Sequence, residues 1–119
     1  MAPMSKPALR PVDLGHLDRY TGGSRSLNEE ILRLFNVQCR EMVARLEGLA
    51  GSSDAKSWHE ATHTLKGAAR GVGAFALADA AAAAEETGPS DREAALECLA
   101  RLRNRAEAVE SFIAGFLGS

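Results

Sequence analysis

Apolar residues recur at helical spacing through most of this chain, and the clearest case begins near residue 55. At about 100° per residue, a helix in that segment carries one apolar stripe. The stripe consists of Trp58, Ala61, Leu65, Ala68, Ala69 and Val72. Polar side chains occupy the opposite face. The pattern predicts an amphipathic helix over residues 55–70 that buries one side.

Two other segments have the same period and predict long helices. One covers residues 26–50, and its expected buried residues are Leu27, Ile31, Leu34, Phe35, Gln38, Cys39, Met42, Leu46 and Leu49. The other starts near residue 90 and runs to the C-terminus, with Leu96, Leu99, Leu102, Ala106, Val109, Ile113, Phe116 and Leu117 on its apolar side. Between them, the alanine-rich segment 74–87 predicts a helix that packs closely on its neighbours, because alanine is the best helix former.

Capping residues and glycines define where the predicted helices begin and end. Asp13 is expected to cap a short first helix that stops at Gly22. The segments Ser26–Glu29 and Ser90–Glu93 match the capping box of a helix N-terminus, and the segment Gly51–Asp54 should end one helix and cap the next. Because the connections are short, successive helices should be antiparallel. The predicted fold is all-α, an antiparallel up-down four-helix bundle with a short extra N-terminal helix.

Length, charge and cysteine content narrow the class of protein. The chain has 119 residues, enough for one domain, and we place residues 1–12 in a flexible tail and 13–119 in the domain. A net charge of −2 without a long basic run argues against nucleic-acid binding. No apolar run has membrane-spanning length and no signal-peptide core is present, so we expect a cytoplasmic protein. Cys39 and Cys98 lack metal-ligand spacing, and Cys39 is expected to be a buried hydrophobic residue.

The polar face of the 55–70 helix holds an unusual combination of residues. His63 lies nearly opposite the middle of the apolar stripe and should face solvent, with Lys66 and Arg70 close to the same line. Gly67 lies one turn beyond His63, although glycine in a helix interior costs about 0.5–1 kcal/mol relative to alanine. The glycine leaves room beside an imidazole ring, and two cations suit an anion brought to that ring. These residues predict a histidine that accepts a phosphoryl group, with Lys66 as the nearest counter-charge.

The segment His63-Thr-Leu-Lys66-Gly67-Ala-Ala-Arg-Gly-Val-Gly73 resembles the signature of the histidine phosphotransfer (Hpt) domain of multistep two-component phosphorelays. The family pattern is His-x-Leu-Lys-Gly, two small residues, two variable positions, an aliphatic residue and a glycine, and every element is matched. The resemblance implies a four-helix bundle whose second long helix carries the phosphorylated histidine. By residue match, His63 is the phosphorylated nucleophile, Lys66 is the cation beside the phosphate, and Gly67 is the clearance for a receiver domain.

The resemblance also implies partners and a reaction. The imidazole takes a phosphoryl group from an aspartyl phosphate on a response-regulator receiver domain and passes it to another receiver aspartate, downstream of a hybrid sensor histidine kinase. The partner receiver would supply Mg²⁺, and this chain would be a monomeric phosphocarrier without a cofactor or catalytic activity of its own. Arg70, His59 and Gly73 complete the predicted binding residues, with Arg70 either a second phosphate contact or a solvated charge. Phosphorylation by the catalytic domain of a kinase, as in the related chemotaxis domains, stays open.

The residues from His59 to His63 also contain the string His-Glu-x-x-His, the zinc signature of many metalloproteases. In that interpretation both histidines bind the metal, Glu60 is the general base, and Glu85 or Glu86 supplies a third ligand. The longer form of the motif is not matched, nearby cations disfavour a dication, and no extended segment could form a substrate-binding sheet edge. A zinc metalloprotease and a non-catalytic helical adaptor are therefore the alternatives, and the phosphotransfer prediction includes no metal ligand.

Several neighbouring residues have more than one interpretation. His59 is either a solvated histidine or a side chain that tunes the phosphorylated ring. Glu85 could accept a hydrogen bond from His63 and orient it, but periodicity alone does not fix the rotation of the helices. Val37 and Ala44 project from the polar side of their helix, as scattered surface residues or as part of a receiver-docking patch.

Overall fold

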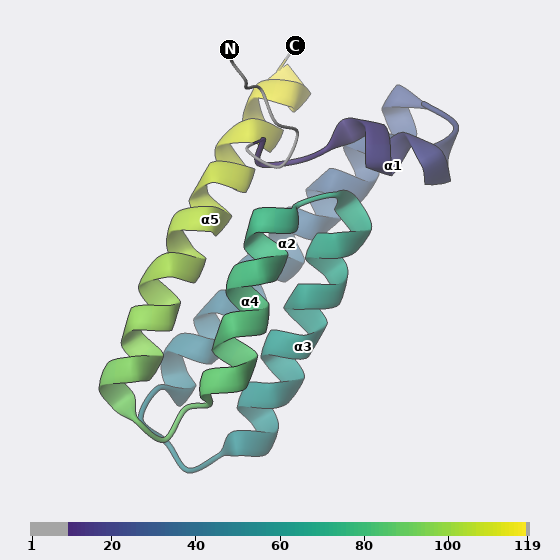
Figure 1. The fold of residues 1–119 in the computed structure, drawn as a ribbon. Coiled ribbons are helices and arrows are strands. Elements are labelled where there is room, and N and C mark those ends of the chain that lie inside the picture. The colour runs from purple at the N-terminus through teal and green to yellow at the C-terminus, as the bar shows by residue number, and fades with distance from the viewer. Residues whose placement is uncertain (1–9, 119) are drawn as a thin grey trace, which may run out of the picture.

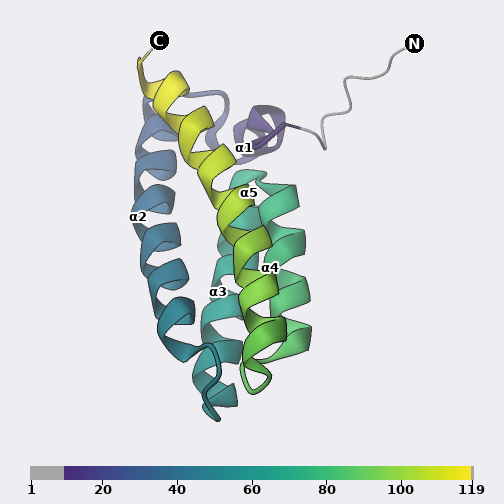
Figure 2. The ribbon, with the colours of Figure 1, turned by 90° about the vertical axis from the view of Figure 1, so that its left-hand side faces the viewer.

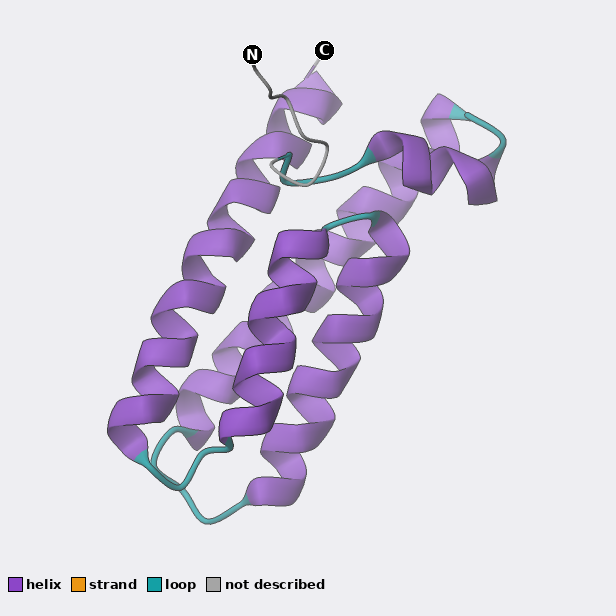
Figure 3. Cartoon of the chain, viewed as in Figure 1, coloured by secondary structure: helices purple, strands orange, loops and turns teal. Residues whose placement is uncertain are grey.

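The computed structural model describes residues 10–118, which form an up-down bundle of α-helices. The helices are α1 (Leu14–Thr21), α2 (Arg25–Leu49), α3 (Ala55–Val72), α4 (Phe75–Thr87) and α5 (Arg92–Gly118) (Figure 1). The four long helices run antiparallel in sequence order, and α1 lies across one end of the bundle (Figures 1 and 2). The described part of the chain contains no strand (Figure 3). The predicted all-α fold, with its short extra helix, is confirmed.

All five helices contribute buried residues to the core, and the apolar stripe of α3 packs there against the small residues of α4. Trp58, Leu65 and Ala69 are fully buried, and Ala68 at the edge of the stripe is half-buried. The indole Nε1 of Trp58 donates a hydrogen bond of 2.7 Å to the carbonyl oxygen of Ala84 on α4. Alanines along α4 let the two backbones approach, so this polar contact can form in the interior. The contact fixes the register between α3 and α4.

Two helix N-termini form as predicted. A side-chain oxygen of Asp13 accepts a hydrogen bond from the backbone N–H of His16, and α1 ends at Gly22 in the left-handed conformation. At the start of α3, Asp54 accepts a hydrogen bond of 3.0 Å from the backbone N–H of Ser57. Each carboxylate satisfies a backbone donor that the helix itself leaves without a partner.

The two predicted capping boxes are wrong in register. The hydroxyl of Ser24, not Ser26, accepts the backbone N–H of Leu27, so the N-cap of α2 lies two residues earlier than expected. At α5 the carboxylate of Asp91, not Ser90, accepts the backbone N–H of Ala94. Both segments offer several residues that can cap, and the sequence pattern did not distinguish them.

The predicted buried side of α2 is also partly wrong. Leu27, Leu34 and Gln38 are exposed, whereas Leu32 and the polar Asn28 are buried. Asn28 is buried beneath α1 because that helix satisfies its amide: Asp18 accepts from its Nδ2 at 2.8 Å, and Thr21 donates to its Oδ1 at 2.6 Å. Because α1 packs on the first turns of α2, the buried face of α2 includes Asn28 and differs from the face that periodicity predicts. On α5, the expected core residue Leu96 is exposed and Ala95 is buried instead.

The start of the domain lies earlier than residue 13. Val12 is buried in the core, and the backbone N–H of Asp13 donates a hydrogen bond of 2.9 Å to the carbonyl oxygen of Gly73. These contacts correct the end of the predicted tail at residue 12. The rest of that prediction falls mainly on residues 1–9, which lie outside the described part of the chain.

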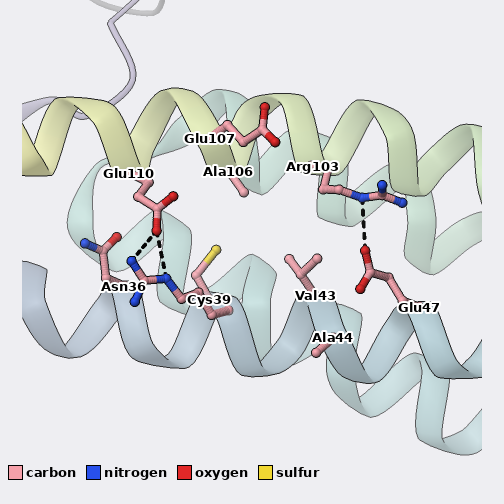
Figure 4. A pocket seen from close by; sticks show the side chains of 10 residues that line it. Asn36, Cys39, Val43, Ala44, Glu47, Arg103, Ala106, Glu107 and Glu110 are labelled. Atoms are coloured by element: carbon pink, nitrogen blue, oxygen red, sulfur yellow. Dashed lines mark hydrogen bonds and ion pairs between the residues drawn. The ribbon is translucent and has the colours of Figure 1, made fainter.

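A pocket lies between α2 and α5 (Figure 4). Ion pairs between the two helices flank it, one joining Arg40 to Glu110 and the other joining Arg103 to Glu47 at 3.1 Å. Cys39 lines its floor, and burial raises the pKa of this thiol to about 11. This agrees with the prediction that Cys39 packs as a small apolar residue. No helix in the described range is long and apolar enough to cross a membrane.

Candidate functional site

His59 and His63 lie side by side on the solvent face of α3. Their rings are stacked, with centroids 5.6 Å apart and planes inclined by 12°. Both side chains are largely exposed, His59 by 63% and His63 by 64%. The buried neighbours Trp58 and Thr62 fix the rotation of the helix, because both side chains lie in the core. The predicted exposure of His63 is confirmed.

Glu85, near the end of α4, contacts three polar residues of α3 and so links the side chains of the site. Its Oε2 lies 3.3 Å from Nδ1 of His63 and 3.3 Å from Nδ1 of His59. Its Oε1 accepts a hydrogen bond of 2.6 Å from Nζ of Lys66. Glu85 directly follows Ala84, whose carbonyl oxygen is bound to the Trp58 indole, so the register of the two helices brings this carboxylate to the histidines.

The hydrogen bond from the Lys66 ammonium is the main cause that holds the pKa of Glu85 below its ordinary value. An ionised carboxylate can only accept hydrogen bonds, so the His63 nitrogen facing it must carry the proton. In a neutral imidazole the second nitrogen, Nε2, then has the free lone pair. The site therefore favours the tautomer of His63 whose Nε2 is a nucleophile. Glu85, which the sequence offered as a hydrogen-bond acceptor for this ring, is in contact with it.

The cations of the predicted site lie in different environments. The Lys66 side chain is only 19% exposed and its ammonium contacts Glu85, beside His63. Arg70 is exposed one turn further along α3, and among the described residues it forms no ion pair. Lys66 is thus held close to the imidazole, whereas Arg70 is free to reorient.

The two glycines of the signature lie at different places on α3. Gly67 is exposed, and a Cβ atom added there would meet no heavy atom of residues 10–118 within 4 Å. Gly73 is buried at the C-cap with a φ of +84°, and an added Cβ would lie 2.6 Å from the carbonyl oxygen of Asp13. Gly73 is ten residues beyond His63, a rise of about 15 Å along a helix. The structure does not bring Gly73 to the histidine, and its contacts serve the junction of α1 and α3.

An apolar groove lies beside the histidine face, between α1, α2 and α3. Its lining residues are Leu17, Tyr20, Ile31, Leu34, Phe35, Gln38, Ala68, Gly71 and Val72. Leu34 is 65% exposed, and Val37 on the same helix is also exposed, as predicted. The predicted patch residue Ala44 is exposed but lies at the pocket toward α5 (Figure 4). Sequence periodicity assigned Leu34 to the core, so it missed most of this groove.

The structure also gathers the residues of the competing zinc interpretation. The potential ligand atoms of His59, His63 and Glu85 all lie within 4.8 Å of one another. Glu60 is exposed, and Glu86 is not part of this cluster. The described residues provide no strand that could bind an extended substrate in the manner of a metalloprotease.

Comparison with known proteins identifies one family. A family model described as the Hpt domain matches residues 30–112, which is most of the chain and includes α3, α4 and the histidine face. No match was found among curated proteins or among solved structures.

Proposed function

The chain belongs to the Hpt domain family, whose members carry phosphoryl groups in phosphorelays, and we propose that His63 is the phosphoryl carrier. It would accept the group from an aspartyl phosphate on a receiver domain and pass it to the aspartate of another receiver. The observation that carries the proposal is the contact of Glu85 with Nδ1 of an exposed histidine. This contact leaves Nε2 both solvent-facing and nucleophilic.

The transfer step follows from this tautomer. The Nε2 lone pair of His63 attacks phosphorus, and the bond between phosphorus and the aspartyl oxygen breaks as the N–P bond forms. The aspartate leaves as a carboxylate, and the imidazole ring, still protonated on Nδ1, becomes positively charged. Glu85 stabilises that charge because its carboxylate already accepts the Nδ1 proton. The reverse step delivers the group to the second receiver.

Lys66 supports both the histidine and the incoming phosphate. An ammonium group has three donors, and one of them binds Oε1 of Glu85 at 2.6 Å. The others are available to the phosphoryl oxygens, whose charge spreads in the transition state of phosphoryl transfer. Arg70 would add a second cation from the exposed surface. The Mg²⁺ ion would belong to the acidic site of the receiver, since oxygen ligands are those that this ion prefers.

The receiver would approach over the glycines and the apolar groove. Gly67 leaves open space beside His63, and Gly71 lines the groove about 12 Å along α3 from the histidine. Exposed Leu34 and Val37 on α2 continue the apolar surface away from α3. A contiguous apolar surface beside a reactive group is typical of a protein interaction site. In this proposal the chain acts as a monomer, so that the face around His63 stays accessible to the receiver. It carries the phosphoryl group and is not itself a catalyst.

The test is transfer from a receiver domain that has been phosphorylated on its aspartate. The native chain should acquire a phosphate that is labile in acid and stable in base, as expected for phosphohistidine, and should return it to a second receiver. His63→Gln should acquire none. Because His63 is exposed, this variant should unfold in urea at the same midpoint as the native chain.

His16→Gln is the matched control, since His16 lies on α1, outside the cluster. It should retain full transfer. Labelling that persists in His63→Gln would remove His63 as the carrier. A chain that no phosphorylated receiver labels would support the adaptor alternative instead.

A further inference from the structure

We propose that His59, His63 and Glu85 form a binding site for a divalent transition-metal ion such as Zn²⁺. We further infer that the bound ion prevents His63 from accepting a phosphoryl group. The first statement stands on the geometry of the three side chains. The second rests on the proposed function, because it assumes that His63 is the phosphoryl carrier.

The distances between the three side chains fit a tetrahedral ion. Zinc binds imidazole nitrogen and carboxylate oxygen at about 2.0–2.1 Å, so the ligand atoms of a tetrahedral site lie about 3.3–3.4 Å apart. Oε2 of Glu85 is 3.3 Å from Nδ1 of His59 and 3.3 Å from Nδ1 of His63. Two edges of the tetrahedron are therefore already present. The third, between the histidines, lies within 4.8 Å and closes by rotation of exposed side chains.

The supporting residues keep one ligand fixed and leave a coordination position open. Lys66 binds Oε1 of Glu85, so the carboxylate is oriented while Oε2 remains available to a metal. Both histidine side chains are more than half exposed, and a water molecule can complete the coordination. The charge of Lys66 opposes a dication. The site should therefore select ions with strong affinity for imidazole, such as Zn²⁺, over Mg²⁺ or Ca²⁺.

Metal binding and phosphoryl acceptance compete for the same lone pair. A neutral imidazole has one protonated nitrogen and one nitrogen with a free lone pair. When a metal binds Nδ1 of His63, the proton that Nδ1 holds in its hydrogen bond to Glu85 must move to Nε2 or leave the ring. In the neutral ring, Nε2 is then an N–H group that cannot attack phosphorus. The metal-bound form of His63 therefore cannot accept a phosphoryl group.

Zinc binding is tested first, by calorimetric titration of the full chain with Zn²⁺ and by the visible absorption of bound Co²⁺. One ion should bind per chain, and Co²⁺ should give the intense bands of tetrahedral coordination. His59→Gln should weaken binding about tenfold or more, because even changes to residues that only support metal ligands cost about 10–100-fold in affinity. His16→Gln, which removes the histidine outside the cluster, should bind as the native chain does.

Zinc inhibition is then measured as the rate of His63 phosphorylation by a small phosphoryl donor, which needs no receiver and no Mg²⁺. One equivalent of bound Zn²⁺ should stop the reaction, a chelator should restore it, and Mg²⁺ should not mimic it. Each variant is compared with its own rate without metal. His59→Gln should require about tenfold more Zn²⁺ for the same inhibition, in line with its weaker binding.

The possible results separate the two proposals. No Zn²⁺ binding, or equal weakening in His59→Gln and His16→Gln, overturns the metal site. Binding that leaves the phosphorylation rate unchanged overturns the competition. Zinc binding that depends on His59, in a chain that no donor phosphorylates even without metal, supports the metal site and overturns the phosphocarrier function alone.

Discussion

The middle and the C-terminal end of α3 contain glycines of the same signature, but the two glycines meet different surroundings. A side chain at Gly67 would project into open space, beside the exposed ring of His63. A side chain at Gly73 would collide with the backbone of Asp13, and its φ of +84° lies in the region that favours glycine. No contact among the described residues requires glycine at Gly67. The fold itself requires it at Gly73.

The difference shows that one short signature can serve two physical purposes. Gly73 allows the chain before α1 to pass close to the end of α3, where Asp13 donates its backbone N–H to the Gly73 carbonyl oxygen. Gly67 lowers the stability of the helix, and no contact within the described fold offsets this cost. Such a cost is expected where a partner protein must approach the helix. Stability and transfer should therefore respond separately to substitutions at these two positions.

Gly73→Ala should have the largest effect on stability. A non-glycine residue held at positive φ costs about 1–3 kcal/mol, and the contact of the new Cβ with Asp13 adds to this. The free energy of unfolding from urea titration should fall by at least that amount. Gly71→Ala is the matched control on the same helix, because its added Cβ meets no atom of the described residues within 4 Å. It should be neutral or should stabilise by up to about 1 kcal/mol; equal losses in both variants would contradict the junction role of Gly73.

Gly67→Gln should give the opposite result, with stable folding and impaired transfer. Glutamine is a better helix former than glycine by about 0.5–1 kcal/mol, so the unfolding free energy should rise. Transfer from a phosphorylated receiver should slow about 100-fold, the scale expected when reacting groups are displaced by about 1 Å. Gly67→Ala should keep the gain in stability with a smaller loss of transfer. A glutamine variant with native transfer rates would show that Gly67 is not the clearance for the partner.

Glu85→Gln should affect transfer less, because glutamine can still accept the Nδ1 proton of His63. A hydrogen bond to a charged group stabilises by about 1 kcal/mol more than a neutral one, which corresponds to about a five- to tenfold slower transfer. The rate should be measured with a small phosphoryl donor, so that receiver docking does not contribute. An unchanged rate would mean that Glu85 neither orients the ring nor stabilises its charge.

The helices could be predicted from the sequence because their period is strong and their ends carry glycine or capping residues. The residue at which a helix starts could not be predicted where several residues that can cap lie close together, as at Ser24 and Ser26. The rotation of α2 depended on a contact distant in sequence, the burial of Asn28 beneath α1. Periodicity describes one helix at a time, so it assigned Leu34 to the core, although this side chain is 65% exposed.

The residues of α3 that face solvent could also be predicted, because they share one helix with a clear apolar stripe. Glu85 could only be suggested, since it comes from another helix and its approach depends on the register of α3 and α4. That register is fixed by the hydrogen bond of the Trp58 indole to Ala84, a contact that no spacing rule specifies. The sequence signal available for Glu85 was its place as a possible third ligand of the His-Glu-x-x-His string.

The N-terminal end of α3 is a third region of this helix. A substitution there should have the smallest effect on the free energy of unfolding, and that effect should depend on pH. The backbone N–H of Ser57, which donates to Asp54, is the main cause that lowers the pKa of this exposed carboxyl below its ordinary value of 3.8. A group whose pKa is lowered by folding stabilises the fold when ionised, above the pKa of the unfolded chain. That contribution is lost as the pH falls through the lower pKa of the folded state.

Asp54→Asn isolates this contribution, because asparagine caps a helix about as well as aspartate but does not titrate. The unfolding free energies of the two chains should be compared between about pH 7 and about pH 3, a range that covers the ordinary pKa of aspartate. The advantage of the native chain should be constant near neutral pH and should shrink at the acidic end. Taking the difference between the chains removes the titration of the other carboxylates, which both share. A difference that stays constant over the whole range would show that the cap stabilises α3 through its hydrogen bond alone, without its charge.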